Sequence, residues 1–145
     1  MAEKVLLDPA FRRLDNIFTP EDLKRIYSMA DVIWGKDEPI PEAELEAVKN
    51  DVVAVITGYW RYGDVNRFPK LRAIMEVSGG FPSPNHLDYA SCFARSIRVM
   101  SCAPAFGPAV AEMGLGLAIA CARQIVWNHE NFRIGKAHWS HTEFG

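Results

Sequence analysis

Cysteine is scarce in this sequence, and its three cysteines, Cys92, Cys102 and Cys121, form no CxxC pair. A sparse, odd-numbered set of thiols with no signal peptide beside it is typical of intracellular proteins whose thiols stay reduced. We therefore expect a cytoplasmic protein.

Long apolar runs are lacking as well. The first residues hold too short an apolar run for a signal peptide, and acidic residues interrupt it. The most apolar stretch, residues 109–127, contains Glu112 and Arg123, so only residues 113–122 are free of charge. Because a membrane-spanning helix needs about 20 apolar residues, the sequence predicts a soluble protein that does not enter a membrane.

Charge of one sign is not concentrated anywhere in the chain. The 16 basic and 18 acidic residues give a formal net charge of -2. A nucleic-acid-binding domain would show a basic excess on one face, so no nucleic-acid partner is expected. The length of 145 residues and the hydrophobic content of 49% indicate one domain with a packed core.

Short apolar runs recur along the chain, and each is followed by a helical or turn segment. Several runs are nearly continuous in Val, Ile and Leu, which is typical of parallel strands covered on both faces. Their spacing of about 20 to 27 residues suits strand–helix–strand crossovers. The predicted strands are Lys4–Asp8, Asp31–Trp34, Asp51–Thr57, Arg72–Ser78 and Ile97–Ser101.

The segments between these runs carry helix start signals. Thr19 and Pro20 supply an N-cap and a first-turn proline, and two acids follow them. Strands alternating with helices predict an α/β, flavodoxin-like, doubly wound parallel sheet of five strands in the order 2-1-3-4-5, with a long C-terminal helix. Ligands bind beyond the carboxyl ends of the strands in such sheets. The predicted helices span about 19–30, 40–49, 62–69, 86–95 and 108–132.

The usual ligands of this fold find little support in the residues. The loop Asp8–Arg13 lacks the glycines and hydroxyls of a flavin phosphate site, and Asp8 is expected to cap a turn instead. The residues after the third predicted strand include no phosphoacceptor acid. The run Gly114–Ile119 lacks the third glycine of a dinucleotide fingerprint and lies in a predicted helix. His138 and His141 have no third ligand spaced with them, so no metal site is expected.

Three segments carry a family pattern: residues 53–58 (VAVITG), 71–90 (LRAIMEVSGGFPSPNHLDYA) and 97–123 (IRVMSCAPAFGPAVAEMGLGLAIACAR). They resemble the first half of the D-isomer-specific 2-hydroxyacid dehydrogenases. This family includes the phosphoglycerate, glyoxylate/hydroxypyruvate and formate dehydrogenases. The resemblance runs from about Val5 to about Arg133.

The resemblance implies that residues 1–134 are the substrate-binding (catalytic) half of such an enzyme, with 135–145 a tail leading toward an absent NAD-binding domain. In the family, that second domain carries the catalytic arginine, its glutamate partner and the general-acid histidine. No catalytic residue is therefore assigned here, and His129, His138 and His141 do not take that role. The full-length parent would use NAD or NADP, whereas this chain alone is expected to hold no cofactor and to be inactive.

The resemblance also implies a substrate site. In the family, backbone amides after the fourth strand hold the substrate carboxylate, and paired glycines allow the close approach that this needs. The loop after the third strand overhangs the substrate, and a position after the fifth strand lies near the nicotinamide. The matching residues are Ser78, Gly79, Gly80 and Phe81 for the carboxylate, Tyr59 and Trp60 for the pocket wall, and Phe106 and Gly107 beside the cofactor.

This sequence departs from the family pattern in two places. A proline-rich run, residues 81–84, replaces the usual continuation of the glycine turn, and Phe106 stands where many members have Asn or a small polar residue. A structural alternative stays open for both predicted loops. The glycines can form a tight turn only, and Tyr59 and Trp60 can cover a sheet edge.

The long predicted helix has no polar face between Met113 and Ala122. A helix that is apolar all round is buried on more than one side, so we expect a homodimer through this helix, or a swapped arrangement of it. The other expected partner is a small 2-oxo or 2-hydroxy acid ligand. Two other functions stay open. One is a stand-alone, non-catalytic flavodoxin-like module, and the other is a binder of a flavin or a small anion.

Overall fold

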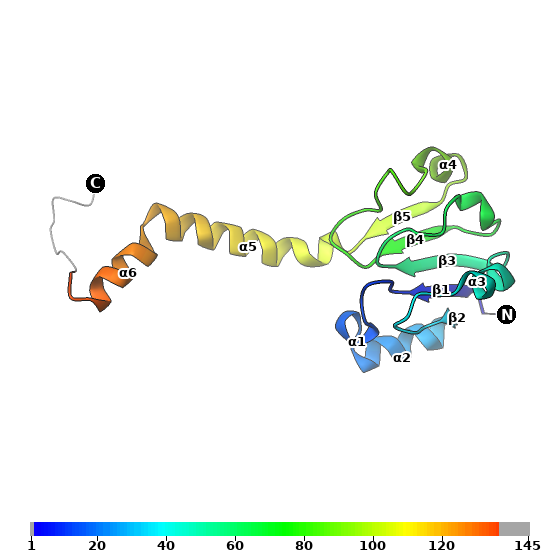
Figure 1. Cartoon of the computed structure of the whole chain (residues 1–145), viewed down its shortest axis with the longest axis horizontal. Coiled ribbons are helices and arrows are strands. Elements are labelled where there is room, and N and C mark those ends of the chain that lie inside the picture. The colour runs from blue at the N-terminus through cyan, green and yellow to red at the C-terminus, as the bar shows by residue number, and fades with distance from the viewer. Residues whose placement is uncertain (1, 137–145) are drawn as a thin grey trace. The chain divides into compact units, whose positions relative to one another are not determined.

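The computed structural model describes residues 2–136, and its strands form a parallel sheet in the order β2-β1-β3-β4-β5. This is the predicted order, so the flavodoxin-like α/β fold is confirmed. The arrows all point the same way in Figure 1, so the carboxyl ends of the strands share one edge of the sheet. The strands are β1 (Lys4–Asp8), β2 (Asp31–Trp34), β3 (Val52–Thr57), β4 (Ala73–Glu76) and β5 (Arg98–Ser101).

The helices connect these strands on both sides of the sheet. Thr19 caps the second helix as its sequence predicts, because its hydroxyl oxygen accepts the Asp22 amide at 3.2 Å and Pro20 occupies the first turn. The helical elements are α1 (Leu14–Ile17), α2 (Pro20–Met29), α3 (Glu42–Val48), the 3-10 turn η1 (Val65–Arg67), α4 (Tyr89–Ala94), α5 (Ala103–Ala122) and α6 (Ile125–Arg133).

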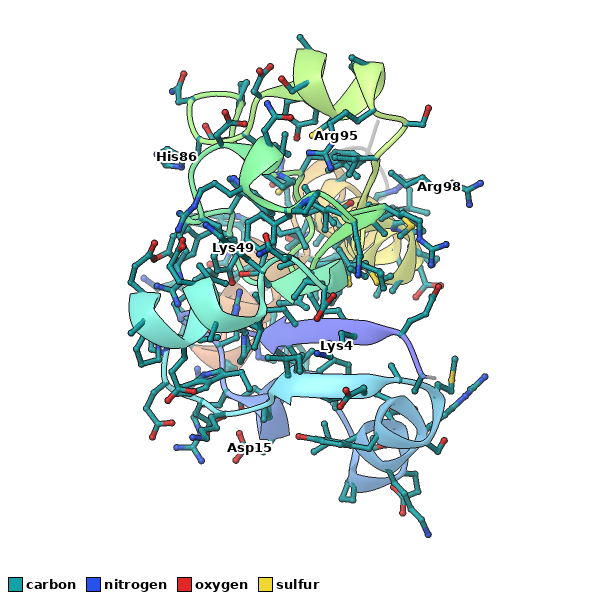
Figure 2. All side chains as sticks on the ribbon, turned by 90° about the vertical axis from the view of Figure 1, so that its right-hand side faces the viewer. Lys4, Asp15, Lys49, His86, Arg95 and Arg98 are labelled. Atoms are coloured by element: carbon teal, nitrogen blue, oxygen red, sulfur yellow. The ribbon has the colours of Figure 1, made fainter. Side chains whose placement is uncertain are left out.

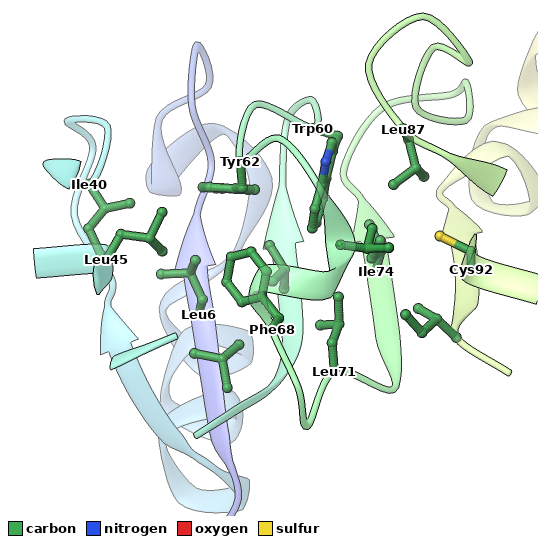
Figure 3. Close-up of a cluster of buried hydrophobic side chains, with 14 residues drawn as sticks. Leu6, Ile40, Leu45, Trp60, Tyr62, Phe68, Leu71, Ile74, Leu87 and Cys92 are labelled. Atoms are coloured by element: carbon green, nitrogen blue, oxygen red, sulfur yellow. The ribbon is translucent and has the colours of Figure 1, made fainter. Parts of the chain in front are cut away.

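The main hydrophobic core lies on one face of the sheet (Figure 3). Leu6, Val55 and Ile74 project from neighbouring strands, and all three are completely buried. The side chains that cover them come from α3, η1, α4 and the loops beside these elements. The covering side chains include Leu45, Trp60, Tyr62, Val65, Phe68, Leu87 and Cys92.

The long C-terminal helix differs from the predicted single helix over 108–132. Gln124 adopts a left-handed backbone conformation with φ of 50°, which ends α5 and starts α6. The start of α5 also lies earlier, at Ala103, whose amide donates to the Ser101 hydroxyl oxygen at 3.3 Å. Pro108 therefore lies within the helix rather than at its first turn. The sequence located this helical region but not its break or its beginning.

Two compact units make up the molecule, Met1–Ala105 and Phe106–Gly145. The first unit holds the sheet, and the second holds most of α5 and all of α6. The predicted tail, 135–145, lies almost entirely outside the described residues.

The apolar side chains of α5 are exposed. Its large apolar residues from Phe106 to Ile119 are each between 49% and 66% exposed. By length and composition alone α5 is long and apolar enough to cross a membrane, with a mean hydropathy of 1.6 over its most apolar window. Core helices of water-soluble proteins meet the same two criteria.

The amino-terminal edge of the sheet carries ion pairs and charged hydrogen bonds, and charged side chains surround it in Figure 2. Asp51 accepts from Lys4 at 3.2 Å and from Lys70 at 2.6 Å. The Arg95 guanidinium donates to the carbonyl oxygens of Val65 and Phe68, both at 2.7 Å. The polar groups of this edge thus hold neighbouring segments together.

Candidate functional site

A row of polar residues crosses the sheet at its carboxyl edge. Asp8, Thr57, Glu76 and Ser101 are the last residues of β1, β3, β4 and β5, and adjacent members of this series are register partners. Side chains at paired positions of parallel strands project from the same face of the sheet. Asp8, Thr57 and Glu76 are the buried polar or charged residues among those that the structure describes. Buried polar side chains are therefore concentrated at the edge where this fold binds ligands.

Asp8 is fully buried, and surrounding donors compensate its charge. Its Oδ2 accepts from the Arg61 guanidinium and from the Tyr62 hydroxyl, both at 2.7 Å, and from the Ile40 amide at 3.4 Å. Its Oδ1 accepts from the Ala10 amide at 3.4 Å, which confirms the predicted turn cap. Burial of the Tyr62 hydroxyl, reinforced by the charge on Asp8, raises the pKa of Tyr62. This network joins the loops that follow β1, β2 and β3.

Glu76 lacks comparable compensation. The residue is only 7% exposed; its Oε1 accepts from the Ser78 hydroxyl, whereas its Oε2 is buried and has no hydrogen-bond partner. None of the ion pairs found among the described residues includes Glu76. Desolvation and then the Glu76 charge raise the pKa of Tyr89 in α4. A buried carboxylate in this state is costly, since protein normally supplies donors or a cation to such a group.

The turn after β4 presents free backbone amides beside Glu76. Ser78 is half-buried, whereas Gly79, Gly80 and Phe81 are exposed. The Gly80 amide donates to the Ser78 Oγ at 3.3 Å. The amides of Ser78, Gly79 and Phe81 donate to no acceptor among residues 2–136. Three exposed or half-exposed amides on one short turn can bind an anion.

The two predicted pocket-wall residues in the loop after β3 differ in their exposure to solvent. Tyr59 is 42% exposed, and its ring stacks on Phe11 from the loop after β1, with centroids 6.0 Å apart. Trp60 is only 1% exposed and lies in the core, where its ring contacts Tyr62 and Phe68 edge-on and its Nε1 donates to the Gly63 carbonyl at 2.7 Å. Tyr59 is therefore available to a ligand at this edge, whereas Trp60 stabilises the loop from beneath.

Gly58 allows the loops after β1 and β3 to approach each other. A Cβ atom at this position would lie 2.4 Å from the Pro9 carbonyl oxygen and 3.1 Å from the Phe11 ring. Because backbone cannot yield to such a contact, any larger residue would separate the two loops. Gly58 therefore sets the position of the Phe11–Tyr59 stack.

A hollow of about 390 Å³ lies between the loops that follow β3 and β4. Asp64, His86 and Asp88 line it together with Gly63, Pro84, Asn85 and Leu87. Asp88 accepts two amides and the Ser91 hydroxyl at the start of α4, and the Ser91 hydroxyl bond is the main cause that lowers its pKa. The hollow thus carries two aspartates and one histidine, and one of the aspartates caps α4.

The residues predicted to lie beside a cofactor belong to the second unit. Phe106 is 50% exposed in α5, and a Cβ at Gly107 would meet nothing within 4 Å. The glycine run Gly114–Ile119 lies within α5, not in a strand–turn–helix corner. The described residues therefore provide no glycine-rich cradle for a dinucleotide pyrophosphate, and they do not fit such a cofactor by themselves. His138 and His141 lie outside the described residues.

Solved structures of other proteins share this fold, although no protein-family model and no curated protein matches the sequence. The crystal structure of a phosphoglycerate oxidoreductase from Rhizobium etli is 26% identical, with a TM-score of 0.73 over 96% of this chain and 42% of that chain. A protein from Thermus thermophilus is 24% identical, with a TM-score of 0.53 over 97% of this chain and 43% of its own, and supports the fold alone.

This chain spans less than half the length of either of these two structures. It therefore has the fold of one part of an oxidoreductase. This likeness agrees with the resemblance of the sequence to one domain of a dehydrogenase. The loop residues predicted as a substrate site lie at the carboxyl edge of the sheet, and Glu76 is the residue that sequence reasoning missed. The available signal was an acid that ends an otherwise apolar strand.

Replacing each buried carboxylate by its amide is expected to change the free energy of unfolding differently at Asp8 and at Glu76. Asp8→Asn is expected to lower the free energy of unfolding by about 2 to 3 kcal/mol, because Arg61 loses its counter-charge. Glu76→Gln is expected to leave it unchanged or to raise it by up to about 2 kcal/mol, because an uncompensated charge is removed. Urea unfolding followed by far-ultraviolet circular dichroism measures both. Equal destabilisation by the two substitutions would contradict the difference inferred here.

Proposed function

We propose that this chain is the substrate-binding half of an NAD(P)-dependent 2-hydroxyacid dehydrogenase, and that it binds the carboxylate of a 2-oxo or 2-hydroxy acid. The observation that carries the proposal is the turn Ser78–Phe81, whose free amides follow an interior strand at the carboxyl edge of the sheet. The sequence resemblance and the likeness to part of an oxidoreductase support it.

The contribution of this chain is binding and orientation of the acid. The turn amides hold the carboxylate, and Tyr59 with Phe11 forms an exposed aromatic wall at the same edge of the sheet. In the complete enzyme a nicotinamide cofactor, held by a second domain, supplies the hydride chemistry at the 2-carbon of the acid. Holding that carbon in place is this chain's share of catalysis.

Loss of one turn amide is expected to weaken binding. Phe81→Pro removes an amide donor, and because a hydrogen bond to a charged group contributes about 1.5 to 3 kcal/mol, the affinity for D-lactate should fall about tenfold or more. Phe81→Leu keeps the amide and is the matched control, expected to bind within about twofold of the original protein.

The measurement is a titration followed by amide chemical shifts. D-lactate is expected to move the amide signals of Gly79, Gly80 and Phe81, and the same sample is expected not to oxidise NADH in the presence of glyoxylate. Shifts located elsewhere, or none at all, would favour the alternative function, a non-catalytic flavodoxin-like module.

Self-association through α5 is the second element of the proposal. The exposed apolar side chains of this helix, such as Val110, Met113 and Leu117, offer a surface of the kind that soluble proteins cover with a partner. The occupant proposed is a second copy of the chain, because an apolar helix in one copy supplies the same surface in the other.

Leu117→Glu is expected to shift a dimer toward monomer, because each interface would then bury two carboxylates beside apolar side chains. Asn128→Glu, which adds the same charge to exposed α6, is the control and is expected to leave the dimer intact. Sedimentation equilibrium over a range of protein concentrations measures the effect. A protein that stays monomeric at high concentration would refute the dimer.

A further inference from the structure

We infer that Glu76 makes the turn after β4 selective for acids with a single negative charge, and that it disfavours 2-oxo and 2-hydroxy acids bearing a second carboxylate or a phosphate. This inference rests on the proposed function, since it concerns the acid bound at the turn. Glu76 is given this role because it is buried, accepts a hydrogen bond from Ser78 next to the turn and carries an uncompensated charge.

Glu76 and the turn are linked by a short hydrogen-bond relay. The Gly80 amide donates to Ser78 Oγ at 3.3 Å, and the Ser78 hydroxyl donates to Glu76 Oε1. Because the Ser78 proton is committed to Glu76, its oxygen is left to accept the Gly80 amide. The relay therefore fixes the conformation of the turn and leaves the amides of Gly79 and Phe81 free for a ligand.

The same relay places the Glu76 charge two hydrogen bonds from the Gly80 amide, and Gly80 lies between the two residues whose free amides are proposed to bind the anion. The first charge of a bound acid is compensated by those amides. A second charge on the acid is repelled by Glu76, which takes part in no ion pair among the described residues and has a buried carboxylate oxygen without a partner. Asp8 cannot act in this way, because Arg61 already compensates its charge at 2.7 Å.

The expected discrimination follows from Coulomb's law. Two like charges separated by a few hydrogen-bond lengths in a partly buried site repel with an energy that corresponds to about tenfold or more in affinity. The preferred ligands are therefore singly charged acids such as glyoxylate, hydroxypyruvate, lactate or glycerate. Dicarboxylic and phosphorylated acids of the same type are expected to bind more weakly.

The test compares D-lactate with D-malate, which differ by one carboxylate, through the amide shifts of Gly79 and Phe81 at one fixed ionic strength. The original protein is expected to bind D-lactate about tenfold more tightly than D-malate. Glu76→Gln should bring this ratio close to one. Glu44→Gln removes an equal charge from an exposed site on α3 and should leave the ratio unchanged.

A second variant keeps the test decisive if the glutamine variant does not fold. Glu76→Met keeps the side-chain volume, removes the charge and is expected to narrow the ratio in the same way. An unchanged ratio in either folded variant would overturn the inference while leaving the proposed function in place. Failure of D-lactate to shift the turn amides in the original protein would overturn the proposed function, and the inference with it.

Discussion

Burying a carboxylate costs free energy unless hydrogen-bond donors or a cation compensate its charge. This requirement determines how the loops are arranged at the carboxyl edge of the sheet. Asp8 is met by Arg61, Tyr62 and two backbone amides. These partners come from the loops that follow β1, β2 and β3. The Arg61 guanidinium also donates to the Ile40 carbonyl at 3.0 Å. One buried charge therefore holds three loops in fixed positions at the edge where the proposed site lies.

Glu76 shows what the same constraint does when compensation is incomplete. It lies two strands from Asp8 in the same polar row, yet among the described residues only the Ser78 hydroxyl donates a hydrogen bond to it. A residue of this kind lowers stability, and natural sequences keep such costs mostly where function requires them. The stability cost and the proposed charge selectivity are thus two effects of one side chain. The proposed anion site on the neighbouring glycine turn has the opposite charge preference, because backbone amides attract an anion.

Much of the fold follows from local pattern. Continuous apolar runs located all five strands, and helix start signals such as Thr19–Pro20 located α2 and α3. The sequence missed α1, and only the short 3-10 turn η1 forms within the predicted helix over 62–69. The break at Gln124 did not follow, because a left-handed residue in a polar position leaves no apolar signature. Trp60 was expected at a pocket wall, yet its ring lies in the core, since burial depends on the packing of Tyr62 and Phe68 around it.

The site was predictable only in part for the same reason. The paired glycines after β4 mark a turn within a short stretch of sequence, and free amides on that turn are what the proposed anion site requires. The partners of Asp8 outside its own turn lie 32 to 54 positions away, and they come together only once the loops are folded. The polar row needs the register of four strands, which no local pattern contains. The glycine turn and the turn cap of Asp8 were therefore predictable from the sequence, whereas the charge balance of the edge was not.

The most direct test of the account is a crystal structure of this protein with bound D-glycerate. The glycerate carboxylate is expected to accept from the amides of Gly79 and Phe81 at about 2.9 Å, with its remaining carbons beside Tyr59. A carboxylate bound instead to Arg61, above the switch point between β1 and β3, would contradict it. In that case the Asp8–Arg61 pair, and not the turn after β4, would be the centre of the ligand site.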